Sequence, residues 1–208
     1  MRADIEFWLE YLPRFNGVCE IESVSNARSQ VTVFVDSSSR ASGGVTEGGE
    51  FFYHPWSPSE LAQLSHINFK ECASFLVAAR HWGSQWRGKR VHFMSDNIAA
   101  CGMLRKGRTG DTGTMSSLRE LFWLSVEHDF KMSVSYVPGA SQLADPASRL
   151  DEPGMGAKLH GQFQLYHHFL ALLQHLPDEL AVARWAVLNI PPEFLPPSVL
   201  RSAGINLS

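Results

Sequence analysis

Four acidic residues lie at the ends of predicted elements, and two of them are aspartates that directly follow strands. Asp36 ends the apolar, β-branched run "VTVFV" at 31–35, and Asp96 follows the pattern "RVHFMS" at 90–95. A carboxylate at the exit of a buried strand is poorly suited to the core, whereas open α/β sheets bind their ligands at this edge. Each also has a purely structural explanation, since Asp36 could begin a turn and Asp96 could cap a helix.

The other two carboxylates lie where helices are expected to begin. Glu71 is in the first turn of a helical pattern at 68–86, and Asp145 directly precedes Pro146. Local structure again offers alternatives. Asn68 and Glu71 have the spacing of a capping box, and Asp followed by Pro is a common helix start. Both side chains can nevertheless reach the crevice into which the strand-end aspartates point.

Four carboxylates that converge without a cation repel one another, and their pKa values rise. A hard divalent cation with oxygen ligands removes this repulsion. Two such ions, held about 3.5–4 Å apart, are a common arrangement for phosphoryl chemistry. Taken together, the four acids therefore predict a site for divalent metal ions rather than four unrelated structural roles.

The elements around these acids predict a mixed sheet with right-handed crossovers. Apolar residues recur with helical spacing at 68–86 and 113–129. Strand patterns occur at 31–35, 90–95 and 131–137, with a hairpin at 43–54 whose turn is 47–49.

Helical segments are also expected on both sides of this sheet. Residues 4–17 predict a short amphipathic helix, and residues 155–176 and 178–188 follow helical patterns before a proline-rich end. We expect three parts: an N-terminal connection helix and linker at 1–29, the sheet-forming domain at 30–152 and a helical, proline-rich C-terminal extension at 153–208.

Composition limits the choices of partner and compartment. The 208 residues are 44% hydrophobic, which suits one good core, and the net charge is −3. An odd number of cysteines without a CxxC spacing indicates a reducing compartment. We see neither a signal peptide nor an apolar stretch of membrane-spanning length, so we expect an intracellular protein, cytoplasmic or nuclear, with no membrane partner.

The charge is unevenly distributed. Residues 80–119 carry eight basic side chains against two acidic ones, in a chain that is acidic overall. This stretch is either a solvated helix face or a surface that follows phosphates. Its candidate phosphate ligands are Arg105, Lys106 and Arg108, in the glycine-rich segment "LRKGRTGDTG".

The order of four motifs resembles the ribonuclease H domain of retroelement reverse transcriptases. The motifs are "FVDSSS", "INFKECASFLVAARHW", "VHFMSDNIAACGMLRKG" and "VSYVPGASQLADPASRL", and together they cover about residues 30–150. The last one is similar to the DIRS-like and hepadnavirus-like kind, in which AD is followed shortly by SR. The segment at 4–17 is similar to the helical connection that precedes this domain in such polyproteins.

This resemblance implies a ribonuclease H-like fold, a five-stranded mixed sheet flanked by helices. It implies cleavage of the RNA strand of an RNA–DNA hybrid with two Mg²⁺ ions, for which Mn²⁺ can substitute. It also implies the reverse transcriptase domain of the same element as a partner. The metal ligands carried over are Asp36, Glu71, Asp96 and Asp145.

The resemblance and the expected geometry together assign roles to the acids. Asp36 would bridge both ions, Asp145 would hold the ion that activates water, and Glu71 with Asp96 would hold the ion at the leaving oxygen. Small polar residues beside the acids would read the 2′-hydroxyls of RNA: Ser37, Ser38, Asn68 and Asn97. The basic residues named above would position the hybrid through its phosphates.

Two departures from the family's pattern leave other functions open. Many members have a His shortly before the last Asp and an Asn near it, where this chain has Tyr136 and Gln142. A non-catalytic scaffold or hybrid-binding module of the same fold is one alternative, and an integrase- or resolvase-like DNA nuclease is another. The position of Glu71, on the first crossover helix, favours ribonuclease H over the integrase-like arrangement.

Overall fold

A five-stranded mixed sheet forms the centre of the computed structural model, which describes residues 2–14 and 29–174. The strands are arranged in the order β3-β2-β1-β4-β5. Strand β1 is antiparallel to β2 and parallel to β4, β3 is antiparallel to β2, and β5 is parallel to β4. Their bounds are β1 (Gln30–Ser37), β2 (Ala41–Thr46), β3 (Phe51–Pro55), β4 (Arg90–Ser95) and β5 (Lys131–Tyr136). The predicted mixed sheet is therefore confirmed.

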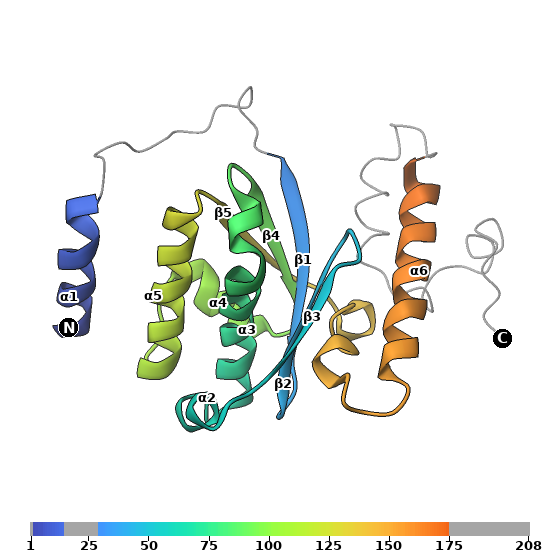
Figure 1. Ribbon diagram of the computed structural model, residues 1–208, viewed down its shortest axis with the longest axis horizontal. Helices are drawn as coiled ribbons and strands as arrows, with labels where there is room; N and C mark the ends of the chain where they lie inside the picture. Colours follow the sequence, from blue (N-terminus) through green and yellow to red (C-terminus); the bar gives the residue numbers. More distant parts are fainter. Residues whose placement is uncertain (1, 15–28, 175–208) are drawn as a thin grey trace.

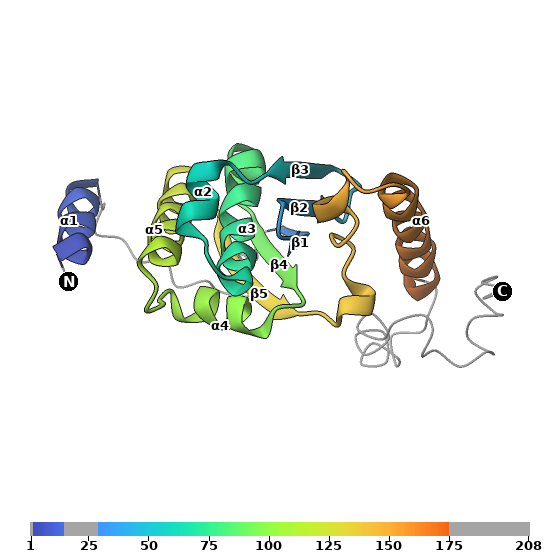
Figure 2. The same ribbon diagram turned by 90° about the horizontal axis from the view of Figure 1, so that it is seen from below.

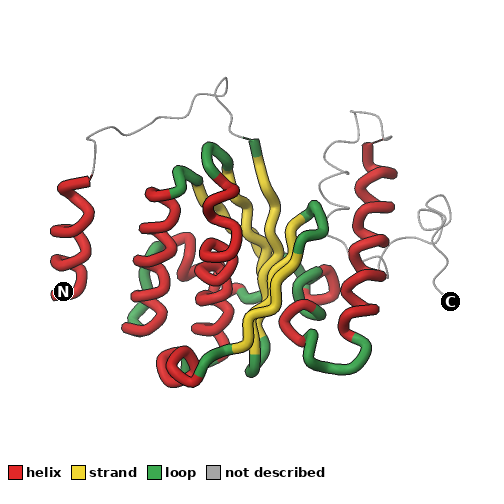
Figure 3. The backbone as a smooth tube through the Cα atoms, viewed as in Figure 1, coloured by secondary structure: helices red, strands yellow, loops and turns green. Residues whose placement is uncertain are grey.

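Helices cover both faces of this sheet (Figures 1 and 2). Helices α3 (Ile67–Trp82), α4 (Ile98–Lys106) and α5 (Thr112–Glu127) lie on one side, and α6 (Met155–Gln174) lies on the other. The helical patterns at 68–86 and 113–129 are confirmed, the first as α3 followed by the 3₁₀ turn η3 (Gly83–Trp86). Figure 3 shows the strands between these helical layers. The predicted helix at 178–188 lies outside the described residues.

Strand β1 is buried on both faces, which explains its uninterrupted apolar run. Side chains alternate between the two faces of a strand. Val33 and Val35 accordingly join the main core beneath α3, with Phe75 and Phe93. Phe34 points the other way, into a second apolar cluster that α6 covers.

Helix α6 packs onto the second face through a short series of apolar side chains. Leu159 is buried there with Val45, and Phe163 and Tyr166 pack against the same cluster. The Tyr166 ring meets the Phe34 ring edge-on, with centroids 5.8 Å apart. The predicted C-terminal helix therefore shares a core with the sheet. None of the helices within the described ranges is long and apolar enough to cross a membrane.

One short helix, α2 (Pro58–Gln63), was not predicted, although its sequence carries a signal. Ser57 is its N-cap, Pro58 is its first residue and Glu60 completes a capping box with Ser57. The segment "SPSE" contains all these features, but the helix is too short to show an apolar period. Local capping chemistry was the only available indication.

The N-terminal helix α1 (Arg2–Tyr11) packs against α5, followed by the 3₁₀ turn η1 (Leu12–Arg14). The ring centroids of Phe7 and Phe122 lie 5.9 Å apart, and Asp4 forms an ion pair with Arg119. A cavity of about 830 Å³ lies beside this contact, and Arg108 is among its lining residues. The helix predicted at 4–17 begins earlier, at Arg2, and ends at Tyr11, two residues before Pro13, while residues 15–17 of the predicted range lie outside the described residues.

Strand β2 approaches the 3₁₀ turn η5 (Ala147–Arg149) so closely that only glycine fits at Gly43. A Cβ atom at this position would lie 2.2 Å from the Ser148 backbone nitrogen and 2.3 Å from the Ala147 carbonyl carbon. Both are backbone atoms, which cannot rotate away. Gly43 also pairs directly with Asp36 across β1 and β2, so this close approach places η5 over the end of β1.

We predict that Gly43→Ala destabilises the protein on the order of 3 kcal/mol, because the added methyl group forces η5 away from the sheet. Urea unfolding of the variant measures this loss. Gly48→Ala is the matched control, since its Cβ would meet only Thr46 Oγ1 at an ordinary 3.6 Å. Equal urea midpoints for the two variants would contradict the close-approach argument.

Candidate metal centre

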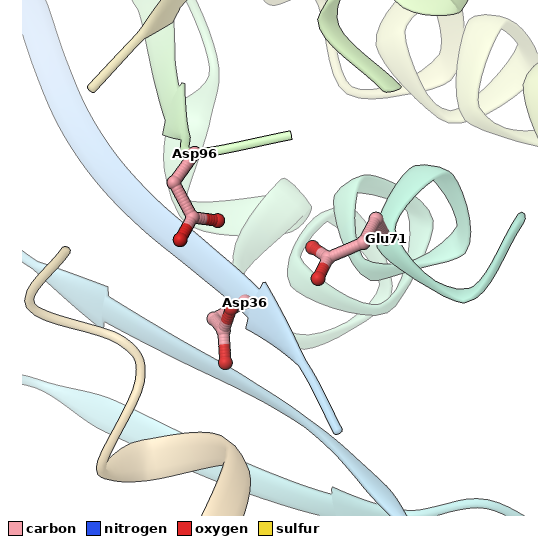
Figure 4. A group of neighbouring side chains, drawn as sticks. All are labelled: Asp36, Glu71 and Asp96. Atoms are coloured by element: carbon pink, nitrogen blue, oxygen red, sulfur yellow. The ribbon is translucent and has the colours of Figure 1, made fainter. Parts of the chain in front are cut away.

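Three carboxylates from three different elements converge at one edge of the sheet (Figure 4). Asp36, Glu71 and Asp96 each offer an oxygen atom, and these atoms all lie within 4.8 Å of one another. Asp36 is the penultimate residue of β1, and Asp96 directly follows β4. Because β1 and β4 are adjacent and parallel, their carboxyl ends meet. Glu71 reaches the same place from the second turn of α3. We call these residues the three-acid group.

The capping explanations for two of these acids are wrong. Helix α3 has its N-cap at His66, whose Nδ1 accepts a hydrogen bond from the Asn68 N–H, so Glu71 lies beyond the N3 position. Helix α4 is capped by Asn97, whose Oδ1 accepts from the Ala100 N–H at 2.9 Å, and not by Asp96. Neither acid therefore has a helix-capping role that accounts for its presence.

Asp145 lies near the three-acid group but is not part of it among the described residues. The expectation that it caps a helix is also wrong, because the residue before η5 is Pro146 and no side chain caps that turn. Its carboxylate instead forms ion pairs with Arg149, at 3.1 Å, and with Lys158, at 2.8 Å. The structure thus brings three of the four predicted ligands together and holds the fourth beside them in ion pairs.

Burial and mutual repulsion dominate the electrostatics of Glu71. The residue is 5% exposed, and its Oε2 atom is buried without a hydrogen-bond partner in the described structure. Burial, followed by the negative charges of Asp36 and Asp96, raises the pKa of Glu71 to about 9. Without a cation, Glu71 is therefore protonated at neutral pH.

The pKa values of the two aspartates are raised as well, and in each case a side-chain hydrogen bond opposes the rise. Burial raises the pKa of Asp36, and the Ser148 hydroxyl, which donates to its Oδ2 at 2.5 Å, opposes this shift. Burial likewise raises the pKa of Asp96, and a hydrogen bond from the Gln142 side chain opposes it. The charges of Asp96 and Asp145 add to the rise at Asp36.

The three-acid group fits a hard divalent cation. All of its potential ligands are carboxylate oxygens, which Mg²⁺ and Mn²⁺ prefer. A buried polar atom without a partner is costly, and Glu71 Oε2 is such an atom. A cation held by Asp36, Glu71 and Asp96 would satisfy this oxygen and offset the repulsion that raises the three pKa values.

Residues after the last strand support this centre, and the sequence analysis gave them no role. Gln142 is fully buried, and its Nε2 donates to the Val35 carbonyl oxygen at 2.9 Å. Ser148 and Arg149, which contact Asp36 and Asp145, are the SR of the last motif. The motif contained the signal for these two, but its spacing alone could not show which acid each would contact.

The small polar residues predicted to contact RNA differ in how deeply they are buried. The Asn97 Nδ2 donates to Asn68 Oδ1 at 2.9 Å, so these two amides form a half-buried pair beside the acids. Ser37 and Ser38 are buried. The Ser38 hydroxyl donates toward the carbonyl oxygens of Ala41 and Ser148. The asparagine pair is therefore the more accessible candidate.

The basic stretch divides into partnered and exposed side chains. Arg80 forms an ion pair with Glu120 at 2.7 Å. The Nη2 atom of Arg105 donates a hydrogen bond to the Val134 carbonyl oxygen. Lys106 and Arg108 are exposed, and the described structure shows no hydrogen bond or ion pair for either. They are the better candidates for phosphate contacts.

No protein-family model matches the chain, and no curated protein matches it. Among solved structures, it is similar to RNase H1 from the halophilic archaeon Halobacterium salinarum, at 17% identity and a TM-score of 0.46, over 60% of this chain and 100% of that one. It is also similar to the N-terminal RNase H domain of a Mycobacterium tuberculosis protein, at 9% identity and a TM-score of 0.44, over 62% of this chain and 98% of that one.

A third similar structure is a foamy viral protease–reverse transcriptase in complex with double-stranded DNA. It is 18% identical, with a TM-score of 0.38, and the match covers 65% of this chain and 24% of that one. The predicted architecture, a five-stranded mixed sheet with flanking helices, is confirmed by the strand order and by the helices on both faces. A fold does not establish an activity, so function has to be argued from the site.

The raised pKa of Glu71 predicts how stability depends on pH when no cation is bound. Its folded-state pKa, about 9, exceeds its ordinary value of 4.5, so the folded protein retains a proton that the unfolded chain releases. The resulting stability is fully present below pH 4.5 and is lost as the pH rises through 9. The free energy of unfolding should fall by up to about 1.4 kcal/mol per pH unit within this window.

Glu71→Gln is neutral at every pH and should show a smaller decline. Thermal melts in the presence of a chelator, from about pH 5 to about pH 9, measure the difference. Glu50→Gln, at an exposed position of the hairpin turn, is the control and should follow the wild type. Parallel curves for the wild type and Glu71→Gln would disprove the assignment of this proton to Glu71.

Proposed function

We propose that this protein is a metal-dependent endoribonuclease that cleaves the RNA strand of RNA–DNA hybrids. We further propose that residues 30–152 are the ribonuclease H part of a DIRS-like or hepadnavirus-like reverse transcriptase, with the polymerase domain of the same element as a partner. The observation that carries the proposal is the buried Glu71 carboxylate, which has an unpartnered Oε2 and offers an oxygen within 4.8 Å of those of Asp36 and Asp96. Such an arrangement is costly to a folded protein unless a cation is bound there.

Asp36, Glu71 and Asp96 would hold one divalent ion, and Asp145 would complete a second position with Asp36. Bound at these acids, two Mg²⁺ ions would supply an activated water and stabilise the charge on the leaving oxygen. The bridging role of Asp36 is supported by the charges of both Asp96 and Asp145, which add to the rise in its pKa caused by burial. Ser148 and Gln142 keep the two aspartates oriented through their hydrogen bonds.

The surface around the acids supports a nucleic acid substrate. The Asn68–Asn97 pair offers amide groups to the 2′-hydroxyls of RNA. Ile67, Ile98 and Tyr136 are exposed at the starts of α3 and α4 and at the end of β5, the elements that surround the acids. Exposed apolar side chains at this edge suit contact with sugar rings.

The position of Glu71 favours this function over an integrase-like DNA nuclease. Glu71 lies on α3, the helix that crosses from the β1–β3 hairpin region to β4. An integrase-like site usually takes its glutamate from a helix late in the domain. A non-catalytic scaffold would have no use for the three-acid group, and it remains one outcome of the test below.

We expect the wild type to cleave a labelled RNA–DNA hybrid in the presence of Mg²⁺ or Mn²⁺ and to leave double-stranded DNA and single-stranded RNA intact. Asp36→Asn and Glu71→Gln should lose at least about a hundredfold in single-turnover rate, because a neutral amide cannot offset the charge of the cation. Both variants should melt at or above the wild-type temperature without metal. Asp36→Asn removes a negative charge from the group, and Glu71→Gln removes the need to take up a proton on folding.

Glu50→Gln is the control and should cleave at the wild-type rate, because this acid lies outside the site. Hybrid binding without cleavage by the wild type would favour the scaffold. Cleavage of double-stranded DNA instead would favour the integrase-like alternative. Wild-type activity of Asp36→Asn would refute the metal centre.

The exposed basic residues should contribute to binding rather than to the chemical step. Replacing Lys106 and Arg108 together with Ala should weaken hybrid binding and reduce its salt dependence by up to about two phosphate contacts' worth of slope. Cleavage at saturating hybrid should change little. Arg87→Ala, which removes an exposed cation at the opposite end of β4, is the control. An unchanged slope would mean that Lys106 and Arg108 form only a solvated surface.

A further inference from the structure

Lys158, on the C-terminal helix α6, contacts Asp145 across 13 positions of the sequence. Its Nζ donates a hydrogen bond to Asp145 Oδ2 at 2.8 Å. The contact is not local, because it depends on where α6 packs. The next residue, Leu159, is buried in the second apolar cluster, and Phe163 and Tyr166 hold the following turns against the same cluster. The apolar packing of α6 therefore fixes the position of Lys158.

Arg149 faces the other oxygen of the same carboxylate. Its Nε lies 3.1 Å from Asp145 Oδ1 but has no hydrogen bond in the described structure, so this is an ion pair without hydrogen-bond geometry. Each oxygen of Asp145 thus faces one positive charge. Of the two, Lys158 makes the better-formed contact.

The four acids are therefore neutralised unequally. Asp145 has two cationic neighbours, whereas Glu71 has a buried oxygen with no partner and Asp36 accepts from the neutral Ser148 hydroxyl. Asp145 is nevertheless close enough for its charge to raise the pKa of both Asp36 and Asp96. It lies at the border of the three-acid group, held by Lys158 and Arg149.

We propose that Lys158 is a positioning residue that holds Asp145 beside the three-acid group and competes with a divalent cation for its carboxylate. This inference rests on the proposed function and adds a specific role for the C-terminal helix. The first cation binds the three-acid group, where the buried Glu71 Oε2 has no hydrogen-bond partner in the described structure. The second requires Asp145, and Lys158 lowers the affinity of that position.

The ordinary alternative is a surface ion pair with no effect on the site. Both side chains are partly exposed, 45% for Lys158 and 29% for Asp145, and most such pairs contribute little to stability. A surface pair would affect the melting temperature slightly and leave cation binding unchanged. Cation affinity therefore separates the two explanations, whereas stability does not.

The test is a titration of the full chain with Mn²⁺, followed by electron paramagnetic resonance of the unbound ion. Lys158→Met keeps most of the side chain's length and removes its charge. We expect two bound ions in the wild type and a second ion that binds on the order of fivefold more tightly in Lys158→Met, the factor for a strong surface ion pair. Lys158→Arg keeps the charge and should restore wild-type affinity.

Lys89→Met is the matched control, because it removes the same charge just before β4, at the end of that strand remote from Asp96. It should bind both ions like the wild type. Lys158→Gln is a second neutral variant that should repeat the result if methionine disturbs α6. The proposal is overturned if Lys158→Met and Lys158→Gln give the same titration curve as Lys89→Met. A single bound ion in every protein would also overturn it.

These results are distinguishable from failure of the proposed function. If the second ion binds more tightly to Lys158→Met but the wild type does not cleave the hybrid, the proposed activity is wrong and the role of Lys158 stands. If the wild type cleaves the hybrid and Lys158→Met binds cations like Lys89→Met, only the role of Lys158 is wrong.

Discussion

The repulsion among buried carboxylates is the constraint on which this site depends. Glu71 and Asp36 are each 5% exposed, and the charge of Arg149 only partly opposes the rise in the pKa values of Glu71 and Asp96. The protein tolerates this arrangement without a cation by keeping Glu71 protonated, as its pKa of about 9 indicates. Cation binding must therefore release a proton, so the affinity of the site should rise with pH. The sheet, the crossover helix and the segment after β5 together hold acids that would otherwise separate.

The segment from Gln142 to Arg149 connects the acids to one another. Gln142 joins β1 to Asp96, Ser148 donates to Asp36, and Arg149 pairs with Asp145. This segment has little regular structure of its own, only the single 3₁₀ turn η5 at its end. Its position comes from the close approach at Gly43 and from the cluster in which Ala144 and Ala147 are buried. Gly43, which pairs with Asp36 in the sheet, thus also fixes the segment that carries the partners of the acids.

The sequence predicted the sheet and most of the helices because apolar periodicity is strong wherever an element has a buried face. It singled out the acids because each one lies near the predicted end or start of such an element, although the structure places Glu71 in the second turn of α3 and Asp145 in a turn before η5. It could not assign helix caps, since His66 and Asn97 cap α3 and α4 at positions only one or two residues from those expected. Nor could it find Lys158, whose contact with Asp145 depends on the packing of α6. Gly43 was equally hidden, because the need for glycine there comes from a segment 105 positions away, at Ser148.

The hydrogen bond between Asp36 and Ser148 joins residues 112 positions apart, and this separation has a consequence for the order of folding during synthesis. Strand β1 leaves the ribosome before residues 143–166, which cover its second face. During that interval Phe34 and Val45 are exposed to other chains, and the acids have neither Ser148 nor Gln142 as donors. Long-range contacts of this kind form late. The nascent chain therefore passes through a stage in which its sheet has one bare apolar face, and this is when it is most prone to aggregate.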